Sequence, residues 1–356
     1  MSAFIIAEAG VNHNGDIGLA RELVYVARRA GADAIKFQTF RAEDVVTQDA
    51  PKAGYQSRTT DSDESQFEML KRLELSAADH RTLKAACEAE GIAFLSTPFD
   101  KKSLGFLVSE MKVNQLKLPS GEITNGPLLL QAARTGLPLI LSTGMATLEE
   151  IRDSLLVLAF GMCDDGVPSP ERALIAYKSA AGRRELEARV CLLHCTSEYP
   201  ASFDDINLSA MQTMRDAFGL PVGLSDHSEG IAMPIAATAL GACVIEKHFT
   251  LDRSLPGPDH RASISPDELS MMVNGIRQTE IALGHGQKVP SEAELQNRQT
   301  MRKSLVAECD ISDGEVFTAE NLGVKRPGSG ASPMLYWDFL SATASRPYKA
   351  GELIDP

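Results

Sequence analysis

The chain has 356 residues, of which 44% are hydrophobic, so it is long enough to bury a large core. Its formal net charge of −13 argues against nucleic acid or an anionic membrane as its main partner. We find no secretory leader pattern and no apolar stretch that could span a bilayer. The six cysteines form no CxxC pair, so we expect reduced, mostly buried thiols in a cytoplasmic protein.

Eight short apolar runs predict β-strands. Most of them are rich in Val, Ile, Leu or Phe and are bounded by Gly, Pro or Ser. Such near-continuous apolar runs are typical of parallel strands that are buried on both faces. In chain order the runs are Phe4–Ala9, Ala34–Gln38, Ala93–Thr97, Gln115–Leu118, Leu139–Ser142, Val190–Cys195, Val222–Leu224 and Val244–His248.

Helical patterns lie between the runs. Some carry end signals: Gly31 is a natural C-terminal cap, Ser76 is an N-cap candidate, and Thr147 with Glu150 forms a potential capping box. The alternation of strand and helix predicts a parallel sheet, and eight strands predict closure into a (β/α)8 TIM barrel. The helical patterns cover Gly18–Ala30, Ala77–Glu90, Leu148–Phe160, Pro234–Leu240 and Pro266–Leu283.

Two long stretches interrupt this rhythm. Arg41–Leu75 is polar and charged and follows the second strand, so we expect it to cover the catalytic face as a lid. Phe160–Arg189 reads as a second, irregular insertion.

The character of the sequence changes after the last predicted helix. We expect a catalytic barrel over residues 1–285, a polar linker over 286–300 and a small β-rich module over 301–356. A module of this size has a limited core, so we expect it to lean on its own barrel or on a partner subunit.

The predicted strand ends carry an apparent anion pocket. Lysines supply charge, and hydroxyl groups supply directional hydrogen bonds to phosphate or carboxylate oxygens. Lys36 stands inside an apolar run, where burial without an anionic partner would be costly. The pocket candidates are Lys36, Lys117, Ser96, Thr97, Ser120, Ser142 and Ser225.

Two histidines end the last two predicted strands. His227 and His248 fall at equivalent depth, so their neutral imidazoles could share one metal ion. Only two clear ligands indicate an open coordination sphere, which suits a Lewis acid better than a structural site. Nitrogen and oxygen ligands are compatible with manganese, cobalt or magnesium.

Carboxylates provide acid and base candidates. Glu122 and Asp259 could transfer protons. The role of Glu8 stays open, because it could equally be a buried charge that pairs with Lys36. Arg326 in the small module reads, from composition alone, as a solvated surface charge.

Taken together, these motifs resemble the sialic acid synthase family, whose members carry a C-terminal antifreeze-like (SAF) domain. The similarity covers essentially the whole chain and rests on motif order and spacing. The motifs of the barrel are Ile6-Ala7-Glu8-Ala9-Gly10-Val11-Asn12-His13-Asn14-Gly15, Lys36-Phe37-Gln38-Thr39, Ser96-Thr97-Pro98-Phe99, Leu118-Pro119-Ser120-Gly121-Glu122, Leu193-His194-Cys195-Thr196, Gly223-Leu224-Ser225-Asp226-His227 and Glu246-Lys247-His248-Phe249-Thr250. The motif of the tail is Val324-Lys325-Arg326-Pro327-Gly328.

The resemblance implies that phosphoenolpyruvate condenses with the open-chain aldehyde of an N-acylated mannosamine-type sugar, giving a nine-carbon 2-keto acid and phosphate. It implies phosphoenolpyruvate contacts at Lys36, Thr97, Lys117, Ser120, Ser197 and Ser225. It implies a divalent metal, with Mn²⁺ first and Mg²⁺ or Co²⁺ as alternatives, on His227 and His248, with Lys117 and His248 among the catalytic groups. Sugar and acid–base positions map onto Gln38, Glu122, Tyr199 and Asp259, and Arg326 would reach the N-acyl group across a domain-swapped homodimer.

Two departures from the family pattern concern Asn14, where some relatives have an acidic or longer residue, and Ser197, where some have Asn. The expected product is N-acetylneuraminate. The alternative is legionaminic acid, or after it pseudaminic acid, made from a 2,4-diacetamido-2,4,6-trideoxyhexose. The segment from Ala53 to Leu70 resembles N-acetylneuraminic or legionaminic acid synthases more than the pseudaminic branch.

Two further readings remain open. A Schiff-base aldolase or lyase on a barrel would use Lys117 as nucleophile, although paired histidines and a second lysine speak against it. A sugar-binding protein without catalysis would keep the barrel and the SAF module but release no phosphate.

Overall fold

The computed structural model describes residues 2–61 and 63–356, and for Tyr55 and Arg58 only the backbone. Ser62, which belongs to the predicted lid, therefore lies outside the described residues. The chain forms two compact units, Met1–Gly284 and His285–Pro356, which are described separately. No helix among the described residues is long and apolar enough to cross a membrane.

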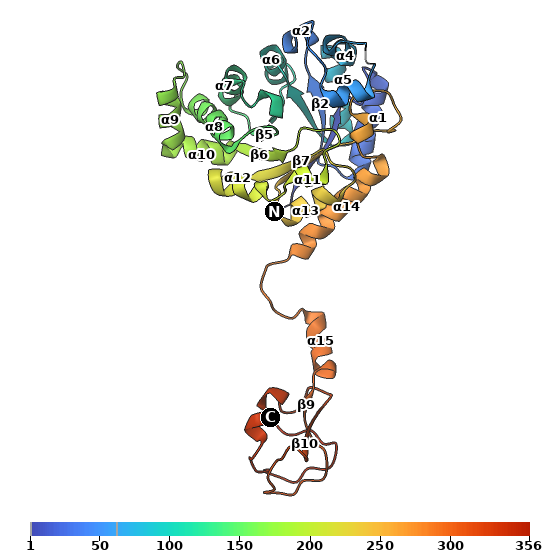
Figure 1. Ribbon diagram of the computed structural model, residues 1–356, viewed down its shortest axis with the longest axis vertical. Coiled ribbons are helices and arrows are strands. Elements are labelled where there is room, and N and C mark those ends of the chain that lie inside the picture. The colour runs from blue at the N-terminus through green and yellow to red at the C-terminus, as the bar shows by residue number, and fades with distance from the viewer. Residues whose placement is uncertain (1, 62) are drawn as a thin grey trace. The chain divides into compact units, whose positions relative to one another are not determined.

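The first unit is a barrel of eight parallel strands with helices around it (Figure 1). The strands follow one another in the order β3-β2-β1-β8-β7-β6-β5-β4, and β3 and β4 are neighbours. This confirms the predicted TIM barrel. The strands are β1 (Phe4–Gly10), β2 (Ala34–Thr39), β3 (Ala93–Pro98), β4 (Leu116–Leu118), β5 (Leu139–Ser142), β6 (Val190–Cys195), β7 (Val222–Asp226) and β8 (Val244–His248).

A helix follows each strand, and the predicted end signals are present. Gly31 adopts a left-handed conformation after the first helix, and Thr147 and Glu150 form a reciprocal capping box. The apolar faces of these helices close the core between sheet and helices. The helices are α1 (Ile17–Ala30), α5 (Ala77–Glu90), α6 (Lys101–Ser109), α7 (Gly126–Arg134), α8 (Leu148–Cys163), α12 (Ala210–Phe218), α13 (Ala232–Ala239) and α14 (Pro266–Leu283), with the short α11 (Phe203–Ile206) before α12.

One prediction about an irregular segment was wrong. The insertion predicted over Phe160–Arg189 is mostly helical, with α9 (Pro170–Lys178) and α10 (Ala180–Arg189). The polar linker contains α15 (Glu292–Met301), which starts at a capping box on Ser291. In both places polar, charged residues masked the helical period, while capping groups and good helix formers were sufficient for a helix.

The segment Arg41–Leu75, from here on the lid segment, contains three short helices. These are α2 (Ala42–Val45), α3 (Gly54–Thr59) and α4 (Gln66–Leu73). The last of them is anchored by a small apolar cluster, in which Met69 and Leu73 are buried against residues of the barrel loops. One end of the lid segment is therefore held by hydrophobic burial, and the part before α4 depends on polar contacts.

The second unit has a small core of its own. Strands β9 (Ser304–Ala307) and β10 (Leu322–Lys325) pair antiparallel, followed by the short helix α16 (Tyr336–Phe339). That the unit leans on another surface stays a prediction. Its buried apolar residues are Leu305, Ala307, Ile311, Phe317, Leu322, Ala331, Ala344, Tyr348 and Ile354.

Buried histidines make the barrel sensitive to mild acid. His13 is 1% exposed, and burial lowers its pKa to about 4. Because its folded pKa lies below its unfolded value of about 6.5, stability is complete above pH 6.5 and falls as pH drops toward 4. We expect a loss of about 2 kcal/mol from this group between pH 6.5 and 5. Denaturant unfolding of the His13→Gln variant at both pH values should show a smaller drop, whereas a change at the exposed His285 should leave the drop unaltered.

Candidate active site

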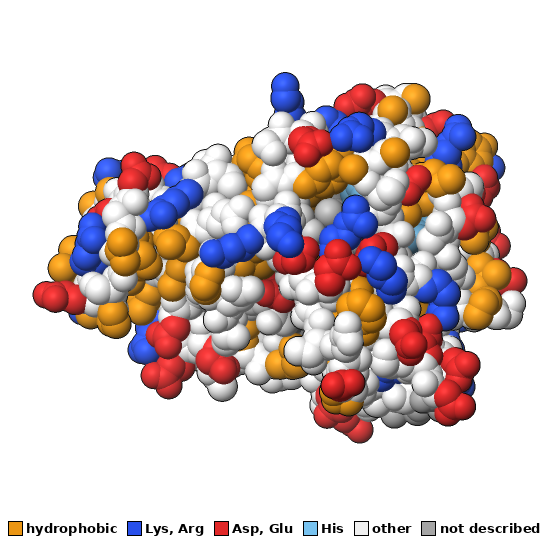
Figure 2. All heavy atoms as spheres, turned by 90° about the horizontal axis from the view of Figure 1, so that it is seen from above, with side chains coloured by type: hydrophobic (Ala, Val, Ile, Leu, Met, Phe, Trp, Pro, Cys, Tyr) orange, Lys and Arg blue, Asp and Glu red, His pale blue; other side chains and the backbone are white. Residues whose placement is uncertain are grey.

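A cavity of about 410 Å³ lies at the carboxyl ends of the strands. Its lining combines residues of the barrel strands and their loops with residues of the lid segment. Figure 2 shows acidic and basic side chains intermingled over the face drawn there. The lining residues are Glu8, Lys36, Gln38, Ala53, Gln56, Gln66, Thr97, Phe99, Lys117, Pro119, Ser120, Gly121, Ser142, Met145, Cys195, Ser197, Tyr199, Ser225, His227, Glu246 and His248.

Strand register brings distant residues together on the cavity floor. Glu8 on β1 is level with Lys36 on β2 and with His248 on β8. On the next pair of strands, Ser225 on β7 is level with Glu246 on β8. Residues that are level on parallel neighbours, with alternation along each strand, project to the same side of the barrel wall.

Two lysines and two carboxylates form a buried charged floor. Lys36 Nζ lies 2.8 Å from Glu8 Oε2 and 3.7 Å from Glu246 Oε2. Lys117 Nζ lies 3.4 Å from Glu246 Oε1, which also accepts a 2.8 Å hydrogen bond from Ser225 Oγ. The anionic partners that burial of Lys36 demanded are therefore present within the chain. The role of Glu8, left open by the sequence, is at least that of a counter-ion.

The pKa values of the two carboxyl groups on the charged floor are shifted in opposite directions. Burial, opposed by Lys36 and reinforced by Glu246, raises the pKa of Glu8 to about 7. Glu246 sits between both lysines, and although burial opposes its ionisation, they lower its pKa to about 2. Burial lowers the pKa of Lys117, while Glu246 and Glu8 outweigh burial and raise that of Lys36. Glu246 is thus the fixed negative charge of the floor.

The predicted hydroxyl groups are mostly in place. Thr97 Oγ1 accepts from Lys36 Nζ at 3.0 Å, and Ser142 Oγ accepts from Lys117 Nζ at 2.7 Å. Ser120 Oγ accepts from the backbone N–H of Gly144 at 2.9 Å. Ser96 was wrongly included, because it is buried beside Thr39 and does not line the cavity.

Gly144 permits a close approach of three side chains. A Cβ atom at this position would lie 2.3 Å from Ser197 Oγ and 2.8 Å from Ser120 Oγ, and Cys195 is also near. Such distances are far below van der Waals contact. The loop after β5 therefore reaches the cavity only because residue 144 has no side chain.

The two histidines meet, as predicted, with ring centroids 5.4 Å apart. His227 Nδ1 lies 2.7 Å from the carbonyl oxygen of Thr196. A carbonyl can only accept, so Nδ1 carries the hydrogen and Nε2 keeps a lone pair. His248 Nδ1 is buried without a hydrogen-bond partner in the described part of the chain, and burial with the neighbouring His227 holds the pKa of His248 well below its usual range.

This donor set fits a divalent metal with an open coordination sphere. Two imidazole nitrogens are available, one oriented by a backbone carbonyl, as is common for metal-bound histidines. No group of three or more His, Cys, Asp or Glu suited to a metal occurs in residues 2–61 and 63–356, so any remaining ligands would come from water or substrate. Burial acts to lower the pKa of His227, but contacts with Cys195, Thr196 and Asp226 together raise it above its usual value. Protons would therefore compete with a metal for the ring.

Tyr199 and Asp259 lie beside the two histidines, and these four residues are called the wall of the site from here on. The Tyr199 ring lies 4.1 Å from the His227 ring, centroid to centroid. Asp259 Oδ2 is 4.0 Å from His248 Nδ1, and burial raises the pKa of this aspartate to about 6. Asn14, which stands where some relatives have an acidic residue, contacts the loop after β8: its Oδ1 lies 3.3 Å from His260 Nε2.

Besides Ser96, two predicted site residues of the barrel, Glu122 and Asp259, are not among the residues that line the cavity. Glu122 follows Gly121 of the lining, but its carboxylate accepts a 2.6 Å hydrogen bond from Asn125. Its acid–base role is supported only by the family resemblance. Arg326 is an exposed residue of the second unit.

Sequence reasoning missed Glu246, Gln56 and Gln66. Glu246 carried the same signal as Lys36, a charge inside an apolar strand, and that signal could have identified it. The two glutamines belong to a segment whose lid position was predicted, but nothing in their spacing indicates which lid residues face inward.

Comparisons with known proteins show the family of this chain. A family model described as the NeuB family matches residues 23–288, and one described as the SAF domain matches residues 302–356. The chain belongs to the NeuB family. It is 49% identical over 98% of its length to N,N'-diacetyllegionaminic acid synthase of Campylobacter jejuni, of which 98% is covered.

Two more relatives of this NeuB-family enzyme are informative. N,N'-diacetyllegionaminic acid synthase of Legionella pneumophila is 47% identical over 99% of this chain and 93% of its own. The crystal structure of N-acetylneuraminic acid synthetase from Leptospira borgpetersenii, in complex with citrate, has a TM-score of 0.67 and 36% identity, covering 83% of this chain and 90% of that one.

Proposed function

We propose that this NeuB-family enzyme condenses phosphoenolpyruvate with a 2,4-diacetamido-2,4,6-trideoxymannose-type aldehyde, giving N,N'-diacetyllegionaminic acid and phosphate. The observation that carries the choice of sugar is the identity of 49% and 47% to two legionaminic acid synthases over nearly the whole chain. The N-acetylneuraminic acid synthetase is 36% identical. N-acetylneuraminate, the product expected first from sequence, therefore becomes the alternative.

The charged floor is suited to phosphoenolpyruvate. Lys36 and Lys117 would hold its phosphate and carboxylate charges, and Thr97, Ser120 and Ser225 would direct hydrogen bonds to its oxygens. Ser197 beside Gly144 would supply a further hydroxyl contact. Glu8 and Glu246 already pair with the lysines, so a bound anion would add its charge to ion pairs that are present within the chain.

The wall is suited to the acceptor aldehyde. His227 and His248 would hold a divalent metal, with Mn²⁺ as the first choice, which when bound supplies Lewis-acid polarisation of the aldehyde. Gln38 and Tyr199 would contact the sugar, and Asp259 and Glu122 would handle protons. The lid segment would limit the access of bulk water.

The proposed reaction balances in atoms and protons. C3 of phosphoenolpyruvate forms a bond to the aldehyde carbon, whose oxygen takes up a proton. One water molecule adds to C2 and loses a proton, and the tetrahedral adduct then releases inorganic phosphate and leaves the 2-keto group. The lysines stabilise phosphate charge throughout these steps.

The proposal includes a homodimer in which Arg326 of the SAF domain reaches the acceptor's N-acyl group in the other subunit. Its support is the family resemblance of the tail and the exposed guanidinium in the second unit.

An acceptor panel tests the proposal. We expect phosphate release that requires phosphoenolpyruvate, a divalent metal and an acceptor, with kcat/KM at least about 100-fold higher for 2,4-diacetamido-2,4,6-trideoxymannose than for N-acetylmannosamine, the discrimination that sites built around buried hydrogen bonds reach. A preference for N-acetylmannosamine would favour the sialic acid alternative. Turnover of neither sugar would overturn the proposal.

A further inference from the structure

The lid segment presents two glutamine amides to the cavity. Gln56 comes from α3, and Gln66 is the first residue of α4. Gln66 Nε2 donates to Gln56 Oε1 at 3.3 Å, and the same oxygen accepts from the backbone N–H of Ala53 at 3.0 Å. These contacts orient the Gln66 amide. Among the described contacts, its carbonyl oxygen and its second N–H have no protein partner.

The amides and the charges come from different sides of the cavity. Lysines, carboxylates and histidines belong to the strands, whereas Gln56 and Gln66 belong to a segment that projects beyond the strand ends. An acceptor whose aldehyde lies at His227 and His248 would therefore direct its more distant substituents toward the lid segment.

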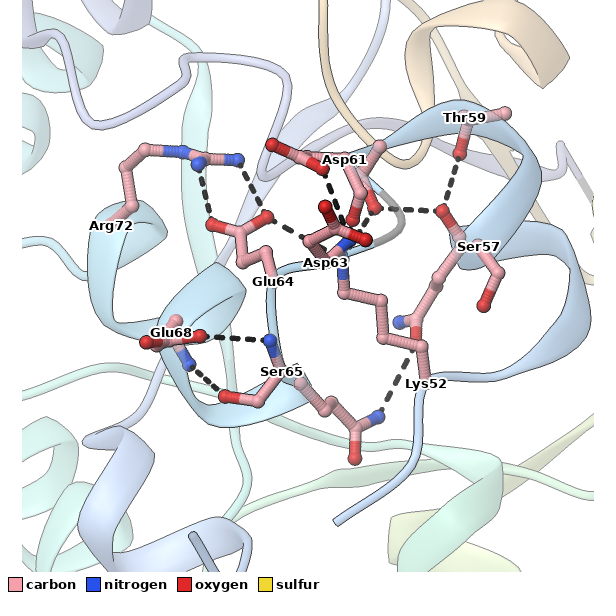
Figure 3. Close-up of polar contacts among 12 residues, drawn as sticks. Lys52, Ser57, Thr59, Asp61, Asp63, Glu64, Ser65, Glu68 and Arg72 are labelled. Carbon is pink, nitrogen blue, oxygen red and sulfur yellow. Dashed lines mark hydrogen bonds and ion pairs between the residues drawn. The ribbon is translucent and has the colours of Figure 1, made fainter. Parts of the chain in front are cut away.

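An ionic network that is buried at Lys52 and exposed at Arg72 fixes the part of the lid segment that carries Gln56 (Figure 3). The Lys52 side chain is only 4% exposed, and its Nζ donates to Thr60 Oγ1 at 3.0 Å and to the Asp61 carbonyl oxygen at 2.5 Å. It also pairs with Glu64 at 3.5 Å, and Glu64 binds Arg72 on α4 through both carboxylate oxygens.

This network connects the polar part of the lid segment to its apolar anchor. Arg72 lies on the helix whose Met69 and Leu73 are buried, so Lys52 and Glu64 tie α3 to a fixed element. At the other end of α3, Thr59 Oγ1 donates to the carbonyl oxygen of Pro258, next to Asp259 of the site, at 3.3 Å. The glutamine pair is thereby held at a defined place over the cavity.

We propose that the Gln56–Gln66 pair recognises the C4 acylamino group of the acceptor, with Lys52 as a positioning residue. This inference rests on the proposed function and names the residues that would select its sugar. An acylamino group offers one N–H and one carbonyl oxygen, and the Gln66 amide has the complementary acceptor and donor to spare. N-acetylmannosamine lacks that group, so binding it leaves the Gln66 amide unsatisfied in a confined site.

Gln66→Leu tests the recognition directly, because leucine keeps similar bulk without hydrogen bonds. We expect kcat/KM for the 2,4-diacetamido sugar to fall about 5- to 150-fold, the range of one or two buried hydrogen bonds. The value for N-acetylmannosamine should stay the same or rise, since no C4 acylamino contact is lost and leucine leaves no amide unsatisfied. Gln212→Leu, at an exposed glutamine of α12, should alter neither value.

Lys52→Met tests the positioning role through a different readout. Because Lys52 does not line the cavity and would act only through the Gln56–Gln66 pair, we expect KM to rise for the 2,4-diacetamido sugar with little change in kcat, and to change less than about threefold for N-acetylmannosamine. Lys52→Arg, which keeps the charge, should restore most of the affinity. Equal rises in KM for both sugars, or no rise for either, would contradict the positioning role.

The outcomes separate this inference from the function on which it rests. Equal losses on both sugars in Gln66→Leu, or no loss on either, would overturn the recognition role while the synthase activity stands. A wild-type protein that turns over neither sugar would overturn both.

Discussion

Replacing Lys36 with methionine should reduce kcat/KM by at least about 100-fold, the cost of removing one preorganised charge contact from an active site. Lys36 Nζ is the 2.8 Å partner of Glu8 and a contact of Thr97. Its loss also leaves a buried carboxylate without its counter-ion, which costs about 3–5 kcal/mol. Steady-state phosphate release and denaturant unfolding measure the two effects separately.

The Lys36→Met/Glu8→Gln double variant separates catalysis from folding. Neutralising Glu8 removes the unpaired buried charge, while Glu246 keeps Lys117 as its partner. We expect most of the lost stability to return and the activity to stay low. Recovery of turnover in the double variant would mean that Lys36 serves only as the counter-ion of Glu8 and does not bind substrate.

Replacing either His227 or His248 with alanine should lower kcat about 1,000-fold, because Lewis-acid activation contributes several kcal/mol. Mn²⁺ binding, followed by electron paramagnetic resonance or calorimetry without substrate, should weaken in parallel. The reason is geometric: each ring supplies one of the two nitrogens available for an ion.

His194 provides a matched control for these variants. It is the penultimate residue of the neighbouring strand β6, but its Nε2 is hydrogen-bonded to the carbonyl oxygen of Ile206, and it does not line the cavity described above. His194→Gln should bind Mn²⁺ within about twofold of the wild type. Full turnover in excess chelator, or in a protein that lacks both His227 and His248, would exclude the metal role.

Much of the architecture was predictable because it depends on local patterns. Apolar runs and capping residues set the strands and most helices, and the position of a residue at a strand end already implies a place on the catalytic face. The helices α6, α7 and α12 were not predicted, and α9, α10 and α15 escaped prediction because their polar surfaces hide the helical period.

The charged floor was predictable only in part. Lys36 and Lys117 stand out as lysines in apolar runs, but which carboxylates meet them depends on register between strands far apart in sequence. Glu122 shows the reverse case, since a residue near the right strand end turns aside to Asn125 because of the local turn after β4.

By itself, the sequence determined the barrel, the SAF domain and the paired histidines, because apolar period, caps and strand-end position are properties of short segments. Only the tertiary structure decided that Glu246 lies between two lysines and that the lid segment directs Gln56 and Gln66 inward. These arrangements follow from register, burial and loop packing, which join residues that no local pattern connects.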